Sequence, residues 1–214
     1  MVIVVGGMIG LGKTSVTKIL ADALHGEAFF EKVEGNKLLE QFYTATPEES
    51  EKNRYPFLLQ LHFLSTRFQL IKEACIKNNN VLDRSIYEDL YFCKRNMELG
   101  KISQLEMSIY ASLVNNMMEE IDGLPKKAPD LMVYLTGSFD TVLDRIKKRG
   151  RKFELDKSLV DYYKYIWSGY DEWVYNSYDK SDVITIDMDT MDVVNNEDDK
   201  TKLIKLVVDK LNDN

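Results

Sequence analysis

The stretch that decides the fold is Gly7-Met8-Ile9-Gly10-Leu11-Gly12-Lys13-Thr14, which follows an apolar run at Val2–Val5. It fits the pattern G-x-x-x-x-G-K-[ST] and has a third glycine inside it. Glycines allow backbone angles that a Cβ would forbid, so successive N–H groups can point inward at phosphate oxygens. The helical periodicity of residues 15–24 places this loop at the positive end of a helix. The sequence therefore predicts a phosphate-binding loop.

Two residues of the loop have predicted roles of their own. Lys13 is expected to bridge the β- and γ-phosphates of ATP, and the hydroxyl of Thr14 is expected to hold Mg²⁺. The alternative is a glycine-rich turn that binds nothing, which the strand-loop-helix context disfavours. GTPases, ATPases and kinases share such loops, so the loop alone does not name a reaction. An N-K-x-D guanine reader is absent from the sequence, since Asn36-Lys37 is followed by Leu38-Leu39.

Short β-branched or aromatic runs recur along the chain and alternate with helical patterns. After Val2–Val5 they lie at Ala28–Phe30, Val81–Leu82, Leu131–Leu135 and Val183–Ile186. Strands that alternate with helices are typical of a parallel sheet covered on both faces. We therefore predict an α/β fold with a five-stranded parallel sheet flanked by helices, in one domain over residues 1–214.

Composition excludes several classes of partner. The formal charge of −7 among 214 residues disfavours a duplex-binding surface, so no nucleic-acid partner is expected. No apolar run approaches the ~20 residues of a membrane span, so no membrane partner is expected. Cys75 and Cys93 show no metal-ligand or disulfide spacing. Reduced thiols and the lack of a leader segment predict a cytoplasmic protein.

Acidic residues follow two of the predicted strands, where open α/β sheets bind their ligands. Glu31 comes after Ala28–Phe30, and Asp83 comes after Val81–Leu82 and precedes Arg84. One acid can accept a hydroxyl proton and the other can support Mg²⁺, as phosphoryl transfer requires. The alternative is that these acids only cap the next segment, and Glu34 is a nearby rival of Glu31.

A helix is predicted from about Pro56 to Lys77. Its apolar stripe is expected to face the core and consists of Phe57, Leu61, Leu64, Phe68, Ile71 and Cys75. The other face carries Gln60 and Arg67, which lie in line and ~10 Å apart along the axis. Helical side chains lean toward the N-terminus, so these two residues can serve one ligand.

Six of the eight residues from Arg145 to Lys152 are basic, although the protein is acidic. Arg145 and Arg149 share a helix face, and Gly150 is expected to end that helix and free Arg151 on a loop. An arginine lid at about 145–156 that closes over ATP would supply charge to the transferring phosphoryl group. The alternative is a solvated basic helix end.

Nearly the whole chain resembles the deoxynucleoside kinases, and most closely the bacterial deoxyadenosine and deoxyguanosine kinases. The motifs that carry the resemblance are Gly7–Thr14, Glu31-Lys32-Val33, Phe57-Leu58-Leu59-Gln60, Asp83-Arg84-Ser85-Ile86-Tyr87-Glu88-Asp89, and Arg145-Ile146-Lys147-Lys148-Arg149-Gly150-Arg151 followed by Glu154. Together they are far more specific than the loop alone. The resemblance implies a P-loop kinase fold and transfer of the γ-phosphate of ATP to the 5′-hydroxyl of a deoxynucleoside.

The resemblance also implies catalytic roles. Glu31 would take the proton of the 5′-hydroxyl, while Arg84 steadies that oxygen and the phosphates. Arg145, Arg149 and Arg151 match the lid of the family. Two positions depart from the family pattern. Asp83 stands where many members have glutamate, which puts its role as a metal ligand or as a partner of Arg84 in doubt, and Phe153 stands where some have a second lid acid.

Acceptor contacts follow from the same resemblance. Tyr43 and Glu154 look like the pair that holds the 3′-hydroxyl, and Gln60 looks like the amide that pairs with the base edge. Arg67 and Asp89 resemble the base-reading pair of members that accept purines or deoxycytidine. A carboxylate suits an exocyclic amine and an arginine suits a purine acceptor. Deoxyadenosine therefore ranks first, with deoxyguanosine and deoxycytidine close.

Two other functions compete with this interpretation. A nucleoside-monophosphate kinase of the thymidylate type shares the fold, but its phosphorylated acceptor needs extra basic contacts. A nucleotide-binding regulatory protein would bind ATP without transfer chemistry. By resemblance alone the chain is also expected to form a homodimer, and residues 187–199 are expected to form an acidic loop near the ATP base.

Overall fold

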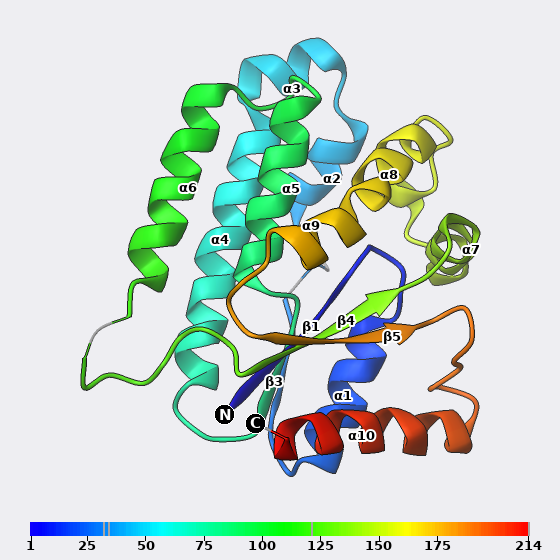
Figure 1. Cartoon of the computed structure of the whole chain (residues 1–214). Coiled ribbons are helices and arrows are strands. Elements are labelled where there is room, and N and C mark those ends of the chain that lie inside the picture. Colours follow the sequence, from blue (N-terminus) through cyan, green and yellow to red (C-terminus); the bar gives the residue numbers. More distant parts are fainter. Residues whose placement is uncertain (32, 34, 121, 214) are drawn as a thin grey trace.

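The computed structural model describes residues 1–31, 33, 35–120 and 122–213. The strands in this range are β1 (Val2–Gly7), β2 (Ala28–Phe29), β3 (Asn80–Asp83), β4 (Leu131–Thr136) and β5 (Asp182–Asp187). They form one sheet in the order β2-β3-β1-β4-β5, and every pairing is parallel (Figure 1). The predicted five-stranded parallel sheet is confirmed. β1 is buried along its whole length, as a central strand covered on both faces must be.

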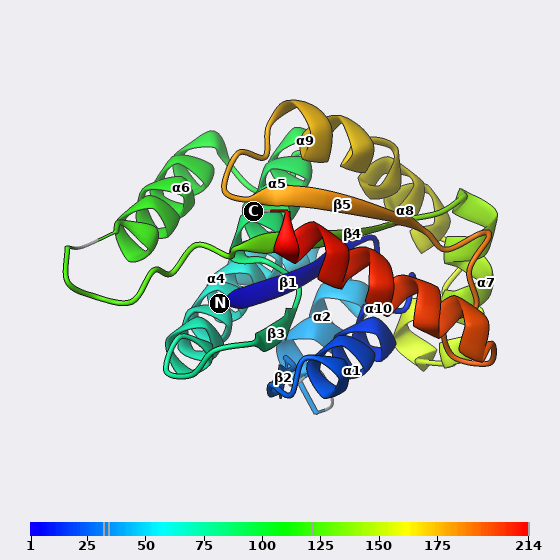
Figure 2. The same cartoon turned by 60° about the horizontal axis from the view of Figure 1, so that its bottom comes forward.

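Helices cover both faces of the sheet. They are α1 (Lys13–Ala23), α2 (Lys37–Thr44), α3 (Pro47–Asn53), α4 (Tyr55–Ala74), α5 (Ile86–Glu98), α6 (Gln104–Met118), α7 (Phe139–Arg149), α8 (Leu159–Ser168), α9 (Tyr170–Asn176) and α10 (Glu197–Asn212), with a 3-10 turn at Lys152–Glu154. α1 and α10 pack together on one face, while α4 and α5 lie on the other with α6 outside them (Figure 2). Among the described residues, no helix has the length and hydropathy to cross a bilayer.

The parallel sheet brings the predicted site segments to one edge. In the strand register Val5 lies beside both Asp83 and Val133, so β1 runs two residues and β4 three residues beyond the last residue of β3. The phosphate-binding loop leaves β1 at this edge, Glu31 follows β2 there, and Asp83 is the last residue of β3. The sheet therefore gathers segments that are far apart in the sequence.

The inward face of α4 differs from the expected one. Leu64 and Ile71 of the predicted apolar stripe are buried, but Phe57, Leu61 and Phe68 are only partly buried. Gln60 and Arg67, expected on the other face, are 4% and 1% exposed. The helix also ends at Ala74, before Cys75 and Lys77. The prediction was wrong because this part of α4 packs over a polar cavity, so its polar side chains face inward.

An ion pair joins the start of α4 to the start of α6. Arg54 has the left-handed backbone angle φ of 54°, which ends α3 and turns the chain into α4. Its guanidinium donates two hydrogen bonds to Glu106, of which that from Nε to Oε1 is 2.9 Å long. Ser103 donates its N–H and its hydroxyl to Oε2 of Glu106 at 2.8 and 2.7 Å. These hydrogen bonds, chiefly that of Arg54, lower the pKa of Glu106 to about 2.

Replacing Glu106 by Gln should lower the free energy of unfolding at pH 7 by about 1 kcal/mol, because the pair is partly exposed. The pKa of Glu106 is lower in the folded chain than its ordinary value of 4.5, so the stabilisation is full above about pH 4.5 and is lost as the pH falls toward about 2. Urea unfolding of both proteins over this pH range measures the difference. A deficit that stays constant with pH would contradict the assignment, and the exposed Glu197→Gln variant is the control.

Candidate active site

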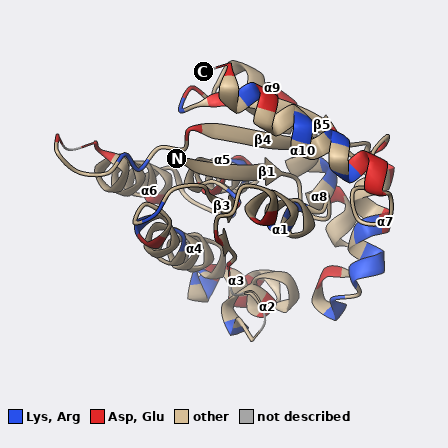
Figure 3. Ribbon diagram, turned by 90° about the horizontal axis from the view of Figure 1, so that it is seen from below, with Lys and Arg blue, Asp and Glu red and all other residues tan. Residues whose placement is uncertain are grey.

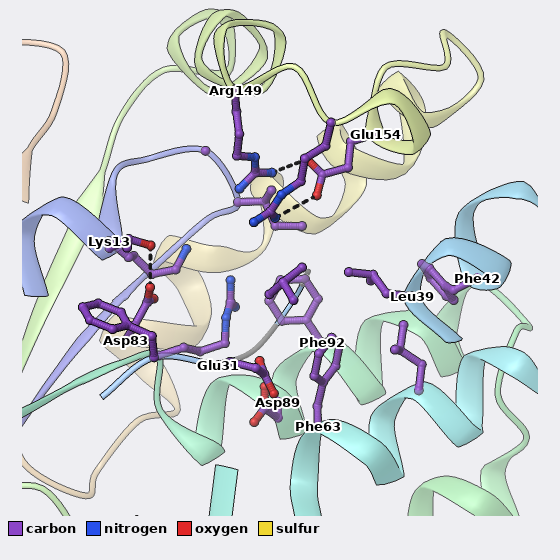
Figure 4. Close-up of a pocket in the computed structure, with 18 of the residues that line it drawn as sticks. Lys13, Glu31, Leu39, Phe42, Phe63, Asp83, Asp89, Phe92, Arg149 and Glu154 are labelled. Atoms are coloured by element: carbon purple, nitrogen blue, oxygen red, sulfur yellow. Dashed lines mark hydrogen bonds and ion pairs between the residues drawn. The ribbon is translucent and has the colours of Figure 1, made fainter. Parts of the chain in front are cut away.

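A cavity of about 770 Å³ opens at the carboxyl edge of the sheet (Figure 4). Its walls come from the phosphate-binding loop, the segment after β2, helices α2 and α4, the β3–α5 junction and the chain around the end of α7. Nearly all predicted site residues line it: Ile9, Gly10, Gly12, Lys13, Thr14, Glu31, Tyr43, Gln60, Arg67, Asp83, Arg84, Asp89, Arg145, Arg149, Arg151 and Glu154. Lys32 and the rival acid Glu34 lie outside the described residues.

The phosphate-binding loop has the backbone that its glycines allow. Gly7, Gly10 and Gly12 have φ of 136°, 93° and 90°. A Cβ on Gly7 would approach the carbonyl oxygen of Leu135 to 2.5 Å, so no other residue fits there. Met8 and Leu11 are buried, so only their backbone groups can face a phosphate. Gly12 precedes the first turn of α1, which confirms that the loop lies at a helix N-terminus.

The ammonium of Lys13 lies inside this loop. Its Nζ donates to the carbonyl oxygens of Gly7 and Met8 at 2.7 and 2.9 Å. Burial, and after it the positive charge of Arg84, lower the pKa of Lys13 to about 7 against the opposing effect of Asp83 and Glu88. An anion such as a phosphate would stabilise the charged form of this lysine.

Thr14 and Asp83 meet where a metal could bind. The hydroxyl of Thr14 donates to Oδ2 of Asp83 at 2.7 Å, and both side chains face the cavity. Among the described residues no group of three His, Cys, Asp or Glu side chains gathers that could hold a metal alone. Mg²⁺ is commonly held by one or two protein oxygens together with substrate phosphates, and a hydroxyl and a carboxylate fit that need.

Arg67 is the centre of a buried cluster of charges. Its Nε and Nη2 donate to Asp89 at 2.9 and 3.4 Å, Nη2 also donates to Glu31 at 2.8 Å, and Nη1 donates to the carbonyl of Asp83 at 2.7 Å. Burial alone would lower the pKa of Arg67, but Asp89 and Glu31 outweigh it and keep the guanidinium charged. Thr66 donates its hydroxyl to the other oxygen of Glu31 at 2.8 Å. Glu31 is therefore held from two sides.

Arg84 follows β3 with a left-handed backbone. Its φ is 82°, which is uncommon for a residue with a side chain, and its N–H donates to the carbonyl of Val5 at 2.9 Å. The guanidinium lies over the ring of Phe92 at 4.6 Å and donates to the hydroxyl of Tyr170 at 3.0 Å. Backbone and side-chain contacts together aim Arg84 into the cavity.

The predicted lid arginines fall into two groups by their contacts. Figure 3 shows the basic residues that gather around the end of α7. Arg145 donates to the carbonyls of Leu11 and Met188 at 3.0 and 2.9 Å, so it joins the phosphate-binding loop to the chain after β5. Gly150 ends α7 with φ of 74°, as predicted. Arg149 and Arg151 both donate to the carboxylate of Glu154, so Arg151 is paired and is not free on its loop.

Tyr43 and Glu154, the pair expected to hold the 3′-hydroxyl, both line the cavity. Glu154 is buried and turns its carboxylate to Arg149 and Arg151. Tyr43 stacks instead on Phe153, with ring centroids 5.9 Å apart and an interplanar angle of 21°. Burial raises the pKa of Tyr43 well above its ordinary value, so its hydroxyl stays protonated and can donate a hydrogen bond.

Several residues of the site were not predicted from the sequence. The cavity has an apolar part lined by Leu39, Phe42, Leu59, Phe63 and Phe92. Phe63 follows Gln60 by three positions and precedes Arg67 by four, a spacing that could have placed it beside them. Three residues outside the cavity lining hydrogen-bond predicted site residues: Thr66 bonds Glu31, Tyr170 bonds Arg84, and Glu88 bonds Gly7. Of these three, only Glu88 falls in a motif named from the sequence.

The chain at 187–199 lies beside the phosphate-binding loop, because the carbonyl of Met188 accepts from Arg145. It is not wholly an acidic loop: Met188, Met191 and Val193 are buried, and α10 begins at Glu197. The sequence pattern missed these apolar anchors because each stands alone among polar residues.

Comparisons with known proteins identify the family. A model of the family described as deoxynucleoside kinase matches residues 3–212. The deoxyguanosine kinase of Lactobacillus acidophilus is 45% identical over 213 residues, which is 98% of this chain and 90% of that protein. The deoxyadenosine kinase of the same species is 42% identical, over 98% of this chain and 96% of its own length. The deoxyadenosine/deoxycytidine kinase of Bacillus subtilis is 31% identical over 100% and 94%.

A solved structure gives the same result. The deoxyadenosine kinase of M. mycoides with bound dATP superposes with a TM-score of 0.77 at 29% identity, over 99% of this chain and 100% of that one. The same enzyme with bound dCTP gives 0.76. The sheet is that of a P-loop kinase, as predicted. Because the family match spans nearly the whole chain, the protein belongs to the deoxynucleoside kinase family.

Proposed function

We propose that the protein transfers the γ-phosphate of ATP to the 5′-hydroxyl of a purine deoxynucleoside in nucleotide salvage, with deoxyadenosine as the first candidate and deoxyguanosine and deoxycytidine next. One observation carries the proposal: a single cavity has the phosphate-binding loop at one end and the Arg67–Asp89 pair beside an apolar wall at the other, with Glu31 between them (Figure 4). Phosphoryl transfer needs donor and acceptor in line, which such a cavity provides.

The donor end would bind ATP through the loop Gly7–Thr14, with Arg145 near its nucleoside part and Arg149 and Arg151 over its phosphates. Thr14 and Asp83 would hold Mg²⁺, which bridges and neutralises the phosphate oxygens when bound. Asp83 is shorter than the glutamate of many family members. Its hydrogen bond to Thr14 supports the metal role over a contact to Arg84.

The chemical step would use Glu31 as the base that accepts the proton of the 5′-hydroxyl. Arg67 and Thr66 hold one oxygen each of this carboxylate, so its orientation is set before the acceptor binds. Lys13 and Arg84 would stabilise the charge on the transferring phosphoryl group. The cavity is lined by all three of these proposed catalytic residues, Glu31, Lys13 and Arg84.

The acceptor would lie along α4. Gln60 is buried on the cavity wall about two helical turns before Arg67. This position supports binding of the base by Gln60, Arg67 and Asp89. Asp89 can still accept from an exocyclic amine, because each carboxylate oxygen has a second lone pair. Phe63 and Phe92 offer apolar contact to a base. Tyr43 and Glu154 would bind the 3′-hydroxyl.

The relatives support a purine acceptor without ranking the two purines. Those named deoxyguanosine kinase are 45% and 46% identical, and one named deoxyadenosine kinase is 42% identical. The order given above therefore depends on Asp89 and Arg67. The thymidylate-type alternative finds no support in the family match or in the relatives. Cys75 and Cys93 are both free thiols, which fits a cytoplasmic salvage enzyme.

A homodimer is also proposed, as the resemblance implies. The Arg54–Glu106 ion pair places the first turns of α4 and α6 side by side. Leu58 on α4 and Leu105 and Ile109 on α6 are 43%, 71% and 48% exposed near this junction. Apolar side chains that gather on an outer helix layer support contact with a second copy of the chain.

Substrate assays with radiolabelled ATP should give dAMP from deoxyadenosine at a higher kcat/KM than dGMP from deoxyguanosine or dCMP from deoxycytidine. Asp89 can accept from the 6-amino group of adenine, where guanine has an oxygen, and Arg67 can donate to a purine acceptor that cytosine lacks. Thymidine should be a poor acceptor, since its base edge carries no exocyclic amine. Phosphorylation of dAMP but not of deoxyadenosine would overturn the proposal. A higher kcat/KM for deoxyguanosine would overturn only the ranking.

Replacing Glu31 by Gln should lower kcat about 10²- to 10⁴-fold, because the proton acceptor is lost while the shape of the side chain is kept. Steady-state kinetics with saturating ATP measure the change. The matched control is Glu27→Gln, since Glu27 is exposed and pairs with Lys77 away from the cavity. A fall of less than about tenfold would be too small for the loss of a general base.

Replacing Leu105 by Glu should convert the dimer to monomers, because a charge would be buried between two copies. Size-exclusion chromatography with light scattering measures the mass of each species. Leu124→Glu is the control, since Leu124 is 62% exposed on the chain after α6. A wild-type protein that is itself monomeric would contradict the proposal.

A further inference from the structure

Glu88, in the first turn of α5, is a fully buried carboxylate outside the catalytic assignment. Its side chain is 0% exposed, and it is not among the residues that line the cavity. A buried charge is retained only where several groups compensate it. The partners of Glu88 therefore indicate what it does.

Helix capping explains only part of its contacts. Ser85 and Glu88 form a capping box at the start of α5, in which the N–H of Ser85 donates to Oε2 at 2.8 Å. The other oxygen, Oε1, accepts from the N–H of Gly7 at 2.8 Å and from the hydroxyl of Tyr170 at 2.7 Å. Gly7 is the first residue of the phosphate-binding loop, so this carboxylate holds the loop from behind.

β1 leaves space for this contact. Gly6 precedes the phosphate-binding pattern, which does not require it. A Cβ at Gly6 would lie 3.0 Å from Oε2 and 3.2 Å from Cδ of Glu88. Gly6 therefore lets the carboxylate approach the end of β1.

The same carboxylate also holds Arg84. Nη1 of Arg84 lies 3.6 Å from Oε1 of Glu88 and donates to the hydroxyl of Tyr170 at 3.0 Å. That hydroxyl donates its own proton to Glu88, so Tyr170 bridges the two charged groups. Oε1 of Glu88 thus holds both Gly7, at the end of β1, and Arg84, which follows β3.

We propose that Glu88 is a positioning residue, which together with Tyr170 fixes Arg84 relative to the phosphate-binding loop for phosphoryl transfer. The inference rests on the proposed function, in which Arg84 and the loop act on one phosphoryl group. Transfer depends on alignment within fractions of an ångström, so a loosened Arg84 lowers kcat. The acceptor contacts at Gln60 and Asp89 do not involve Glu88 or Tyr170, so the KM of the deoxynucleoside stays nearly constant.

Two variants test the network with the full-length protein and its best deoxynucleoside. Glu88→Gln keeps the size of the side chain, but both oxygens of Glu88 accept backbone N–H groups, so the new amide NH₂ must face one of them. Tyr170→Phe removes only the bridging hydroxyl and retains the buried charge. The second variant keeps the inference testable if the first does not fold.

Tyr134→Phe is the matched control. Tyr134 stacks on Tyr170 with ring centroids 6.0 Å apart, and its hydroxyl donates to Asp171 at 2.6 Å. Tyr134→Phe loses the same kind of tyrosine–carboxylate hydrogen bond as Tyr170→Phe. The hydroxyl that it removes donates to Asp171 and not to Glu88, Arg84 or the phosphate-binding loop. Thermal unfolding should show similar losses of stability for Tyr170→Phe and Tyr134→Phe. A difference in kcat between them then reports on the position of Arg84 and not on stability.

We expect kcat to fall about tenfold or more in Glu88→Gln and about three- to tenfold in Tyr170→Phe, with the KM of the deoxynucleoside within about twofold of wild type. Tyr134→Phe should keep kcat within about twofold. The inference is overturned if Tyr170→Phe keeps the wild-type kcat, or if Tyr134→Phe loses as much. If the wild-type protein phosphorylates no deoxynucleoside, the proposed function itself fails and this inference with it.

Discussion

The guanidinium of Arg67 holds together the elements that form the cavity. From α4 it reaches Glu31 after β2, the carbonyl of Asp83 at the end of β3, and Asp89 on α5. Four parts of the fold, of which only the end of β3 and the start of α5 are neighbours in sequence, are thereby fixed around one buried charge. Removing one partner from such a cluster typically costs about 3–5 kcal/mol, since the remaining charges stay buried. The geometry of the site and the stability of this part of the fold therefore depend on the same contacts.

Burial of that charge explains why α4 has polar residues on its inward face. A helix over an apolar core would turn Phe57, Leu61 and Phe68 inward. Here Gln60 and Arg67 face inward instead and line the cavity, where they are proposed to bind the base. The apolar residues Phe57, Leu61 and Phe68 are then left only partly buried. The polar residues that α4 turns toward the cavity thus determine which of its apolar side chains remain partly exposed.

Local signals in the sequence were enough to predict the sheet and the position of most site residues. The strand runs, the loop Gly7–Thr14 and the acids after β2 and β3 each carry their own pattern, and parallel strands bring them to one edge. Contacts that depend on tertiary packing were not predictable in this way. Glu88 reads as a capping acid, and its bond to Gly7 spans 81 positions in the chain. Likewise, no sequence period reveals that Glu154 turns to Arg149 rather than to Tyr43.

Glu154 has consequences for how the two substrates influence each other. Its carboxylate is paired with Arg149 and Arg151, which are proposed to close over the donor, and it lines the cavity where the acceptor sugar is proposed to lie. A hydroxyl that hydrogen-bonds this carboxylate changes the field at Arg149 and Arg151, and a triphosphate that draws those arginines away leaves the carboxylate free to accept. The affinities for the two substrates are then linked, and by reciprocity each must alter the other by the same factor. In the proposed function, one acidic side chain would then make the occupancy of one end of the cavity affect binding at the other end.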